Sequence, residues 1–318
     1  MTPNLFKNLL RFTAAAVLGG CATGGGVSSS SMARPPLPSA AHAATLPRSA
    51  GRLQKTLFVA DVNSSVLLYS ANIHAQNPPL LGQITQGVTR STGVAVDQRT
   101  GTLYAMSSGG SQASIAEYKR SAMSPFKTIT SGLFAPGTIV VDAAGTIYVT
   151  DSSGSAQVVL VYAPKAQAPT RTITIPQNDG GLGGLAFAAN RDLLVATFDT
   201  EHRTGTVYSV APGSSKPVNL NLQEMPGGSL GADKAGNIYA GNPGGEIAVY
   251  TPGSQTPSRF ISANVDGFYS QMMVMPNGTI YWPNYDNEQM YEFAPGAPGP
   301  TNVFKIAGSG VAAAVGSW

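Results

Sequence analysis

Charged side chains are scarce in this chain: 19 Lys and Arg and 16 Asp and Glu make up 11% of its 318 residues. Soluble domains ordinarily have about a quarter of their residues charged, so uncharged polar residues must cover much of this surface. Residues 1–55 hold six of the basic side chains and no acidic one, which leaves 13 basic and 16 acidic side chains in the rest of the chain. Nucleic-acid binding needs clustered basic residues, so the sequence excludes DNA or RNA as a partner.

Cysteine and long apolar runs are also scarce. Cys21 is the only cysteine, so an intrachain disulfide is excluded and the fold must be stabilised by packing. No run of eighteen apolar residues follows residue 20, which excludes a bundle of membrane-spanning helices. Glycine and proline are abundant instead, with 37 and 23 residues, and this composition predicts many turns between short strands.

The first twenty residues have the layout of a secretory signal peptide. Lys7 and Arg11 precede an apolar run at 12–18, and the segment ends on small residues. Leu18-Gly19-Gly20-Cys21 resembles the bacterial lipobox, which implies cleavage before Cys21 and acylation of its thiol. Residue 22 is Ala rather than Asp, and by the same resemblance this favours the outer membrane or the cell surface. We therefore expect a lipid-anchored, extracytoplasmic envelope protein that contacts the membrane through its anchor alone.

Residues 21–54 are predicted to form a flexible tether behind that anchor. The segment is dominated by Gly, Ser, Ala, Thr and Pro, including GGG at 24–26 and SSSS at 28–31. Such a composition buries too little apolar surface to become ordered. The predicted organisation is a signal peptide at 1–20, a lipidated tether at 21–54 and a folded domain at 55–318.

One hydrophobic strand pattern recurs six times in that domain. The copies are LFVAD at 57–61, LYAMS at 103–107, IYVTD at 147–151, LLVAT at 193–197, IYAGN at 238–242 and IYWPN at 280–284. Five of them follow an apolar run and a short turn, as in GVAVD-QRTGT and TIVVD-AAGT. A third and a fourth strand pattern complete each unit, often after a turn such as APG or TPG.

Four strands in every ~45 residues predict an all-β fold, a six-bladed β-propeller with four-stranded antiparallel blades. The first unit lacks its innermost strand, and GVAAAV at 310–315 follows the last unit. We therefore expect the C-terminal strand to complete the first blade and to close the ring. A closed ring leaves no long unpaired edge.

The segments at 57–69 and 147–162 resemble the NHL repeat, in which a strand ends in Asp, a short polar loop follows and a further strand leaves the loop. This resemblance implies relatives among SMP-30-like propellers. The arginine that usually follows the loop asparagine is absent from every unit.

Polar residues that leave the second strands or precede the innermost strands should share one mouth of the channel. The candidate ligand-binding residues are Asp61, Asn63, Asp151, Asp199, His202, Asn242, Tyr269, Gln271, Asn284 and Asp286. Their oxygens suit Ca²⁺ or another divalent cation, although Asp and Asn are also common in turns for conformational reasons. No G-x-S-x-G elbow lies between a strand and a helix, and no HExxH motif or phosphate loop is present.

The sequence therefore favours a binding or scaffolding module over an enzyme. Its partner would be an envelope protein, a glycan or a small ligand at the channel mouth. The alternative is a metal-dependent hydrolase or lactonase of the SMP-30 kind, which the resemblance implies would need a Glu, an Asn and an Asp on one metal.

Overall fold

The computed structural model describes residues 55–71, 77–108, 112–153, 156–176, 181–199, 204–224, 228–241, 245–263 and 271–318. These residues form 24 β-strands, and none of them belongs to a helix long and apolar enough to cross a membrane. The predicted signal peptide, Cys21 and the tether lie outside the described residues. So do three candidate site residues, His202, Asn242 and Tyr269.

The strands form six four-stranded antiparallel sheets, here called blades 1–6. Blade 1 contains β24 (Gly310–Ser317), β1 (Lys55–Asp61), β2 (Ser65–Ser70) and β3 (Leu80–Ile84); blade 2 contains β4 (Ser91–Val96), β5 (Leu103–Ser107), β6 (Ser114–Tyr118) and β7 (Lys127–Ile129); blade 3 contains β8 (Pro136–Val141), β9 (Ile147–Ser153), β10 (Ala156–Tyr162) and β11 (Arg171–Thr174). Blade 4 contains β12 (Gly181–Phe187), β13 (Leu193–Asp199), β14 (Thr204–Val210) and β15 (Val218–Asn219); blade 5 contains β16 (Ser229–Ala232), β17 (Ile238–Gly241), β18 (Glu246–Tyr250) and β19 (Arg259–Ser262); blade 6 contains β20 (Met273–Val274), β21 (Ile280–Asn284), β22 (Gln289–Phe293) and β23 (Asn302–Lys305).

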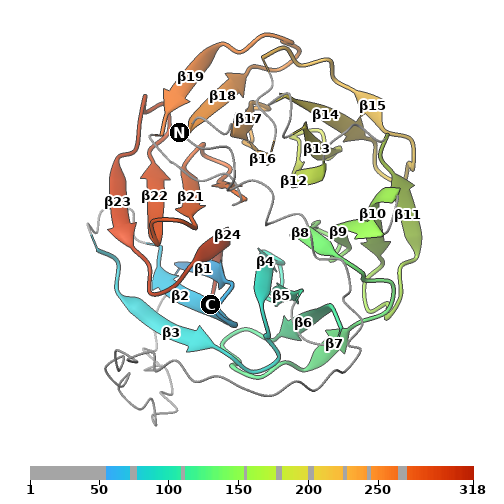
Figure 1. The fold of residues 1–318 in the computed structure, drawn as a ribbon, viewed down its shortest axis with the longest axis vertical. Coiled ribbons are helices and arrows are strands. Elements are labelled where there is room, and N and C mark those ends of the chain that lie inside the picture. Colours follow the sequence, from blue (N-terminus) through green and yellow to red (C-terminus); the bar gives the residue numbers. More distant parts are fainter. Residues whose placement is uncertain are drawn as a thin grey trace, which may run out of the picture. The chain divides into compact units, whose positions relative to one another are not determined.

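The six blades are arranged as a ring, with β24, β4, β8, β12, β16 and β20 as the innermost strands of blades 1 to 6 (Figure 1). Each innermost strand contacts the innermost strands of the two neighbouring blades, from β24 through β4, β8, β12, β16 and β20 back to β24. The predicted six-bladed β-propeller with four-stranded antiparallel blades is confirmed.

The C-terminal strand closes the ring as predicted. β24 pairs antiparallel with β1, with Leu57 opposite Val315 and Lys55 opposite Ser317. Beyond β24, the ring of Trp318 packs edge-on against Phe58, with 5.1 Å between the ring centroids. Blade 1 is therefore built from both ends of the propeller sequence.

Apolar side chains fill the six wedges between adjacent blades. Each wedge has its own buried cluster, to which both neighbouring blades contribute. In β1, Leu57 and Val59 pack toward blade 6, whereas Phe58 and Ala60 pack toward blade 2. Successive side chains of a strand point to opposite faces of its sheet. The second strand of a blade is buried on both faces, and its sequence is therefore an unbroken apolar run.

Tyrosines at the ends of third strands tie blades to the preceding inter-blade loop. The hydroxyl of Tyr118 donates a hydrogen bond to the carbonyl of Gln86 at 2.5 Å. Tyr162 donates to Ser131 at 2.9 Å, in the equivalent loop one blade further along the chain. Because the donor and the acceptor belong to different units of the repeat, each bond fixes one unit against the next.

Basic residues near the start of outer strands make a second kind of inter-blade contact. Nζ of Lys127 donates to the carbonyl of Ala166 at 3.0 Å. Nη1 of Arg171 donates to the carbonyl of Ser214 at 2.7 Å. Arg259 reaches the equivalent turn of blade 6 in the same way, at the Ala297 carbonyl.

Two faces of the ring matter for the site. The exit face carries the loops between the second and third strands of each blade, together with the loops that enter the innermost strands. The hairpin face carries the turns between first and second strands, at 97–102, 142–146, 188–192, 233–237 and 275–279.

Candidate functional site

Asp61 is a buried carboxylate at the exit-face end of β1, with 2% of its surface exposed. Its Oδ1 accepts the backbone N–H of Ser309 at 3.0 Å and the backbone N–H of Asn63 at 3.1 Å. Its Oδ2 accepts the hydroxyl of Ser65 at 2.8 Å. Asp61 therefore holds the loop that enters β24, the innermost strand of its own blade.

Asp151 does the same in blade 3. The backbone N–H groups of Phe134 and Ala135, in the loop that enters β8, donate to its carboxylate at 2.9 and 3.4 Å. Burial raises the pKa of Asp151 above its ordinary value, although both backbone bonds act in the opposite direction. In blade 2 the corresponding residue is Ser107, whose hydroxyl oxygen accepts the N–H of Thr89 at 3.3 Å. In all three blades, a buried polar side chain at the end of the second strand accepts a backbone N–H from the loop that enters the innermost strand. This shared hydrogen bond explains why the three polar residues are buried.

Asn284 is fully buried at the end of β21, and its Oδ1 accepts the N–H groups of Asp286 and Asn287 at 3.0 and 3.3 Å. Asp286, like Asn63, is an exposed residue of an exit-face turn. Asp199 is half-buried at the end of β13. The blade 4 residue aligned with Asp61 in the repeat is Thr197, so Asp199 lies two residues further toward the loop.

Gln271 lies at the exit-face end of the channel. Its Nε2 donates to the carbonyl of Leu230 at 2.5 Å and approaches the carbonyl of Leu185 at 3.5 Å, on two neighbouring innermost strands. Its backbone forms a bridge to Ala312 of β24. Gln271 thus joins β12, β16 and β24 across one end of the channel, and its amide nitrogen is engaged by protein.

The described residues do not present a metal site. The carboxylates of Asp61 and Asp151 already accept hydrogen bonds from backbone and hydroxyl groups. Within the described ranges no three His, Cys, Asp or Glu side chains are grouped so that they could hold a metal ion. The described residues therefore do not fit the metal that an SMP-30-like lactonase would use. Ligand binding by the candidate residues stays a prediction, and three of them, His202, Asn242 and Tyr269, lie outside the described residues.

A cavity of about 760 Å³ follows the ring axis from Gln271 to the hairpin face. All six innermost strands line it, mainly with Val, Ala, Leu, Ile, Met and Gly; the lining includes Val94–Val96, Ile139–Val141, Leu185–Ala188, Leu230–Ala232, Met272–Met275 and Ala312–Gly316. A largely apolar hollow of this size with a few polar groups is the usual form of a small-molecule site.

Polar residues surround the cavity at the hairpin face. Lys55, Gln98, Lys234 and Asn277 are exposed there, and Asp233 is buried beside them. The side-chain amide of Gln98 donates to the carbonyl of Val315 at 2.6 Å, which ties the blade 2 turn to β24. The cavity therefore has an apolar body and a polar mouth.

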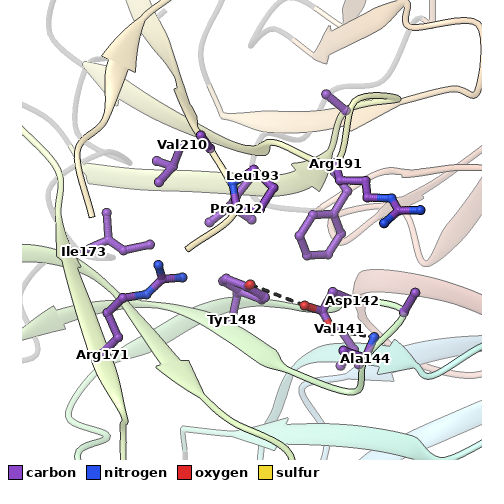
Figure 2. Close-up of a pocket in the computed structure, with 14 residues that line it drawn as sticks. Val141, Asp142, Ala144, Tyr148, Arg171, Ile173, Arg191, Leu193, Val210 and Pro212 are labelled. Carbon is purple, nitrogen blue, oxygen red and sulfur yellow. Dashed lines mark hydrogen bonds between the residues drawn. The ribbon is translucent and has the colours of Figure 1, made fainter. Parts of the chain in front are cut away.

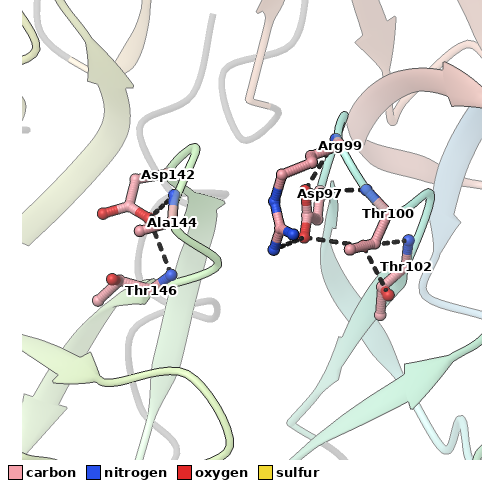
Figure 3. Close-up of polar contacts among 7 residues, drawn as sticks. All are labelled: Asp97, Arg99, Thr100, Thr102, Asp142, Ala144 and Thr146. Carbon is pink, nitrogen blue, oxygen red and sulfur yellow. Dashed lines mark hydrogen bonds and ion pairs between the residues drawn. The ribbon is translucent and has the colours of Figure 1, made fainter.

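Three aspartates organise the hairpin turns. In blade 2, Asp97 accepts the N–H of Arg99 at 2.9 Å and the hydroxyl of Thr100 at 2.7 Å. In blade 3, Asp142 accepts the N–H groups of Ala144 and Thr146 at 2.9 and 2.8 Å. Figure 3 shows these two turns side by side. Their side chains replace the hydrogen bonds that a tight turn leaves unmade.

Asp233 occupies the same place in blade 5. Burial opposes its ionisation, but hydrogen bonds from Asn237, Tyr239 and Ala235 outweigh burial and lower the pKa of Asp233. The Tyr239 hydroxyl lies 2.9 Å from its Oδ2. At neutral pH the mouth of the channel therefore carries an ionised carboxylate beside Lys234.

The sequence pattern pointed to the exit face, whereas the described cavity opens at the hairpin face. Many of the residues that form this cavity belong to the apolar runs GVAV, TIVV and SLGA, which are followed by Asp97, Asp142 and Asp233. Taken as sequence, those runs indicate only strands. Their small side chains leave the axis of the ring unfilled.

Comparison with known proteins supports the fold alone. No protein-family model matches the sequence, and no curated protein matches it. Similar solved structures include one described as a nidogen/laminin complex (13% identity, 82% of this chain and 98% of that chain, TM-score 0.63). They also include hydrazine synthase of Kuenenia stuttgartiensis (12%, 76% and 81%, TM-score 0.56) and a protein from Lactobacillus plantarum (12%, 83% and 99%, TM-score 0.57). At such identities the likeness establishes a β-propeller and leaves the NHL and SMP-30 resemblance as an expectation.

Proposed function

We propose that this protein is a lipid-anchored, extracytoplasmic binding module whose channel takes a small, mainly apolar ligand with one polar end. The observation that carries the proposal is the cavity of about 760 Å³ with apolar walls and a polar mouth. Burial of apolar ligand surface against such walls supplies affinity, and polar groups at the mouth orient the ligand.

Two features of the channel ends support binding from the hairpin face. Gln271 crosses the exit-face end and is held by carbonyls of β16 and β12. The mouth at the hairpin face has Lys55 and Lys234 against Asp233. A ligand with an uncharged polar or an anionic end, directed toward the lysines, suits this mouth.

A role in binding a protein of the envelope is compatible with the same fold. One of the similar structures is described as a nidogen/laminin complex, so a propeller of this general shape is found in a protein–protein assembly. The walls of the channel make the small ligand the better-supported partner for the described residues. A glycan is a poorer match for apolar walls.

A fluorescent apolar probe, N-phenyl-1-naphthylamine, tests the channel. Ala232 lines the cavity and is half-buried, so Ala232→Phe should fill the hollow and weaken probe binding by about tenfold or more. Ala235→Phe is the matched control, because Ala235 is exposed in the same turn. Equal binding by wild type and Ala232→Phe, with both proteins folded by circular dichroism, would contradict the channel site.

The lipid anchor is tested separately in a bacterial expression host. The signal-like segment and the unique Cys21 support acylation at that thiol. Cys21→Ser should abolish incorporation of labelled fatty acid and release the protein from the membrane fraction, whereas Ser28→Ala in the tether should change neither. Membrane retention and labelling of the Cys21→Ser protein would overturn this part of the proposal.

A further inference from the structure

The hairpin turns of four blades share one backbone conformation near their ends. Gly101, Gly145, Gly236 and Gly278 occupy this position with φ between 74° and 88°. Blade 4 has Arg191 at the equivalent place, with φ of 71°. Glycine adopts such left-handed angles without penalty, whereas an arginine is strained there. Arg191 is therefore an exception among these turns, at a position where the backbone favours glycine.

This glycine position is where the turns of neighbouring blades meet. A Cβ atom on Gly145 would lie 3.8 Å from Oδ2 of Asp97 in the preceding blade. A Cβ on Gly278 would lie 3.7 Å from Oδ2 of Asp233, again in the preceding blade. The glycine of each turn therefore lies beside the aspartate of the preceding blade, at a distance where a Cβ would make ordinary van der Waals contact. Between blades 3 and 4 the corresponding pair is Asp142 and Arg191, and both residues line a hollow between the two turns.

A cleft of about 370 Å³ lies between those two turns (Figure 2). Its walls come from both blades, and most of them are apolar: the lining includes Val141, Ile173, Phe187, Leu193, Val210 and Pro212. The polar groups in the cleft are Arg171, Arg191, Asp142 and Tyr148. The volume is within the usual range of small-ligand sites.

The floor of the cleft is a connected set of side chains. The Tyr148 hydroxyl lies 3.4 Å from Oδ2 of Asp142, and the Tyr148 ring packs edge-on against Phe187 with centroids 5.4 Å apart. Arg171 is anchored through Nη1 to the carbonyl of Ser214. The positions of Tyr148 and Arg171 are therefore set before any ligand arrives.

Arg191 differs from these residues because it lies exposed at the rim. Neither of the ion pairs Arg99–Asp97 and Lys127–Glu117 includes it. A guanidinium presents five N–H donors in a plane and binds a carboxylate through two parallel hydrogen bonds. Arg191 is therefore available to hold an anionic group, while the apolar walls below it suit a hydrocarbon body.

We propose that this cleft between blades 3 and 4 is a second ligand site, which takes a small organic monocarboxylate with an apolar body. The two arginines and Asp142 give the cleft a formal charge of +1, which favours an anionic ligand, and the apolar walls favour a carboxylate with a hydrocarbon body over inorganic phosphate. The carboxylate pairs with Arg191, and the apolar body lies along the wall that includes Leu193 and Val210. The cleft adjoins the channel, because Val141, Phe187 and Ala188 line both. Arg171, Arg191, Leu193 and Val210 line the cleft alone, so this proposal does not rest on the channel proposal.

Calorimetric titration of the full chain with 3-phenylpropionate tests the site. Wild type should bind the acid, and raising the salt concentration should weaken binding because the ion pair is screened. The neutral amide of the same acid should bind at least about tenfold more weakly. Inorganic phosphate should bind more weakly than the acid.

Arg191→Gly is the decisive variant, because it places the residue found in the other turns at this position and so should fold at least as well as wild type. It should weaken binding of 3-phenylpropionate about tenfold or more. Arg99→Gln, in the blade 2 turn, is the control and should leave the affinity unchanged. Ala232→Phe, which blocks the channel, should also leave it unchanged.

Three results would overturn the proposal. One is unaltered binding of the acid by Arg191→Gly, and another is failure of wild type to bind the acid at about 10 mM, where a ligand of this size should already be detectable. Loss of binding in Ala232→Phe as well as in Arg191→Gly would also overturn it, because the probe would then be reporting the channel.

Discussion

The backbone N–H of Phe134 lies 2.9 Å from Oδ2 of Asp151 and donates a hydrogen bond to it. The two residues belong to the loop that enters the innermost strand of blade 3 and to the second strand of the same blade. Asp61 and Ser309 repeat this relationship in blade 1, at 3.0 Å. A buried side chain at the end of one strand thus fixes the start of the strand beside it.

Asp151 and Asp233 should make stability depend on pH in opposite directions. Burial raises the pKa of Asp151 above 3.8, so the folded state retains this proton more readily than the unfolded state. The contribution of Asp151 to the unfolding free energy therefore increases as the pH falls through that raised pKa. The pKa of Asp233 is lowered below 3.8, so its stabilising contribution is present above 3.8 and is lost as the pH falls through the lowered pKa.

Urea denaturation between about pH 3 and pH 7 measures both effects. The unfolding free energy of wild type minus that of Asp151→Asn should increase on acidification, and the difference from Asp233→Asn should decrease. Each variant serves as the control for the other. Parallel curves for all three proteins would show that neither carboxyl is perturbed in the folded state.

Removal of the residues after Ile306 should prevent ring closure. The truncated chain loses β24, which leaves β1 with an unpaired edge and exposes Phe58 and Val59. We expect insoluble or protease-sensitive protein, assayed by limited proteolysis of the soluble fraction. Deletion of Trp318 alone is the milder control, since it removes the contact with Phe58 and keeps the strand. A soluble, protease-resistant truncation product would contradict the closure argument.

Lys165→Gly should stabilise the protein by about 1 kcal/mol. Lys165 has φ of 69° in the turn between the third and fourth strands of blade 3, where blades 4 and 5 have Gly213 and Gly253. The reverse change, Gly253→Lys, should destabilise by a similar amount. A Cβ on Gly253 would have no atom within 4 Å, so this control isolates the backbone effect. Chemical denaturation of both variants measures this backbone effect. Equal changes of the same sign in their unfolding free energies would contradict it.

Tyr250→Phe should cost about 1 kcal/mol of unfolding free energy. The Tyr250 hydroxyl donates to the carbonyl of Gln223 at 2.8 Å, and the variant leaves that carbonyl without its donor. Burial also raises the pKa of Tyr250 to about 12, so the bond should persist in moderate alkali and weaken as the pH rises through that value. Tyr285→Phe, at a half-buried exit-face tyrosine, is the control and should be near neutral. A Tyr250→Phe protein as stable as wild type would show that this hydrogen bond does not stabilise the packing of the blades.

The sequence predicted the fold closely because each strand obeys local rules. The apolar runs alternate between two wedges, and the turn residues recur at a constant spacing, so the number of blades and the closing strand could be counted. Some strands are shorter than the patterns suggest. The run at 218–222 contributes only Val218–Asn219, and the run at 272–276 contributes only Met273–Val274. In the second case the N–H of Met272 bonds to Oγ of Ser229 instead of to a strand partner.

The site could be predicted only in part, because spacing places a residue at the end of a strand but does not identify what it bonds to. Asp61, Asp151 and Gln271 lie near the exit face, and each bonds to a backbone group of another strand or loop that spacing does not reveal: Ser309, Phe134 and Leu230. Arg191 was visible in the turn NRD, where other turns have Gly. Its significance emerges only when the turns of two adjacent blades are compared in space.

Pairing of β1 with β24 joins residues at opposite ends of the domain, and this has a consequence for biogenesis. A nascent chain can assemble blades 2 to 6 in order as they are synthesised, but Leu57 must wait for Val315 before its strand is paired on both sides. Closure of the ring thus follows the synthesis of β24. A chain in which β24 has not yet been made would present β1 as an open β-edge to chaperones and proteases.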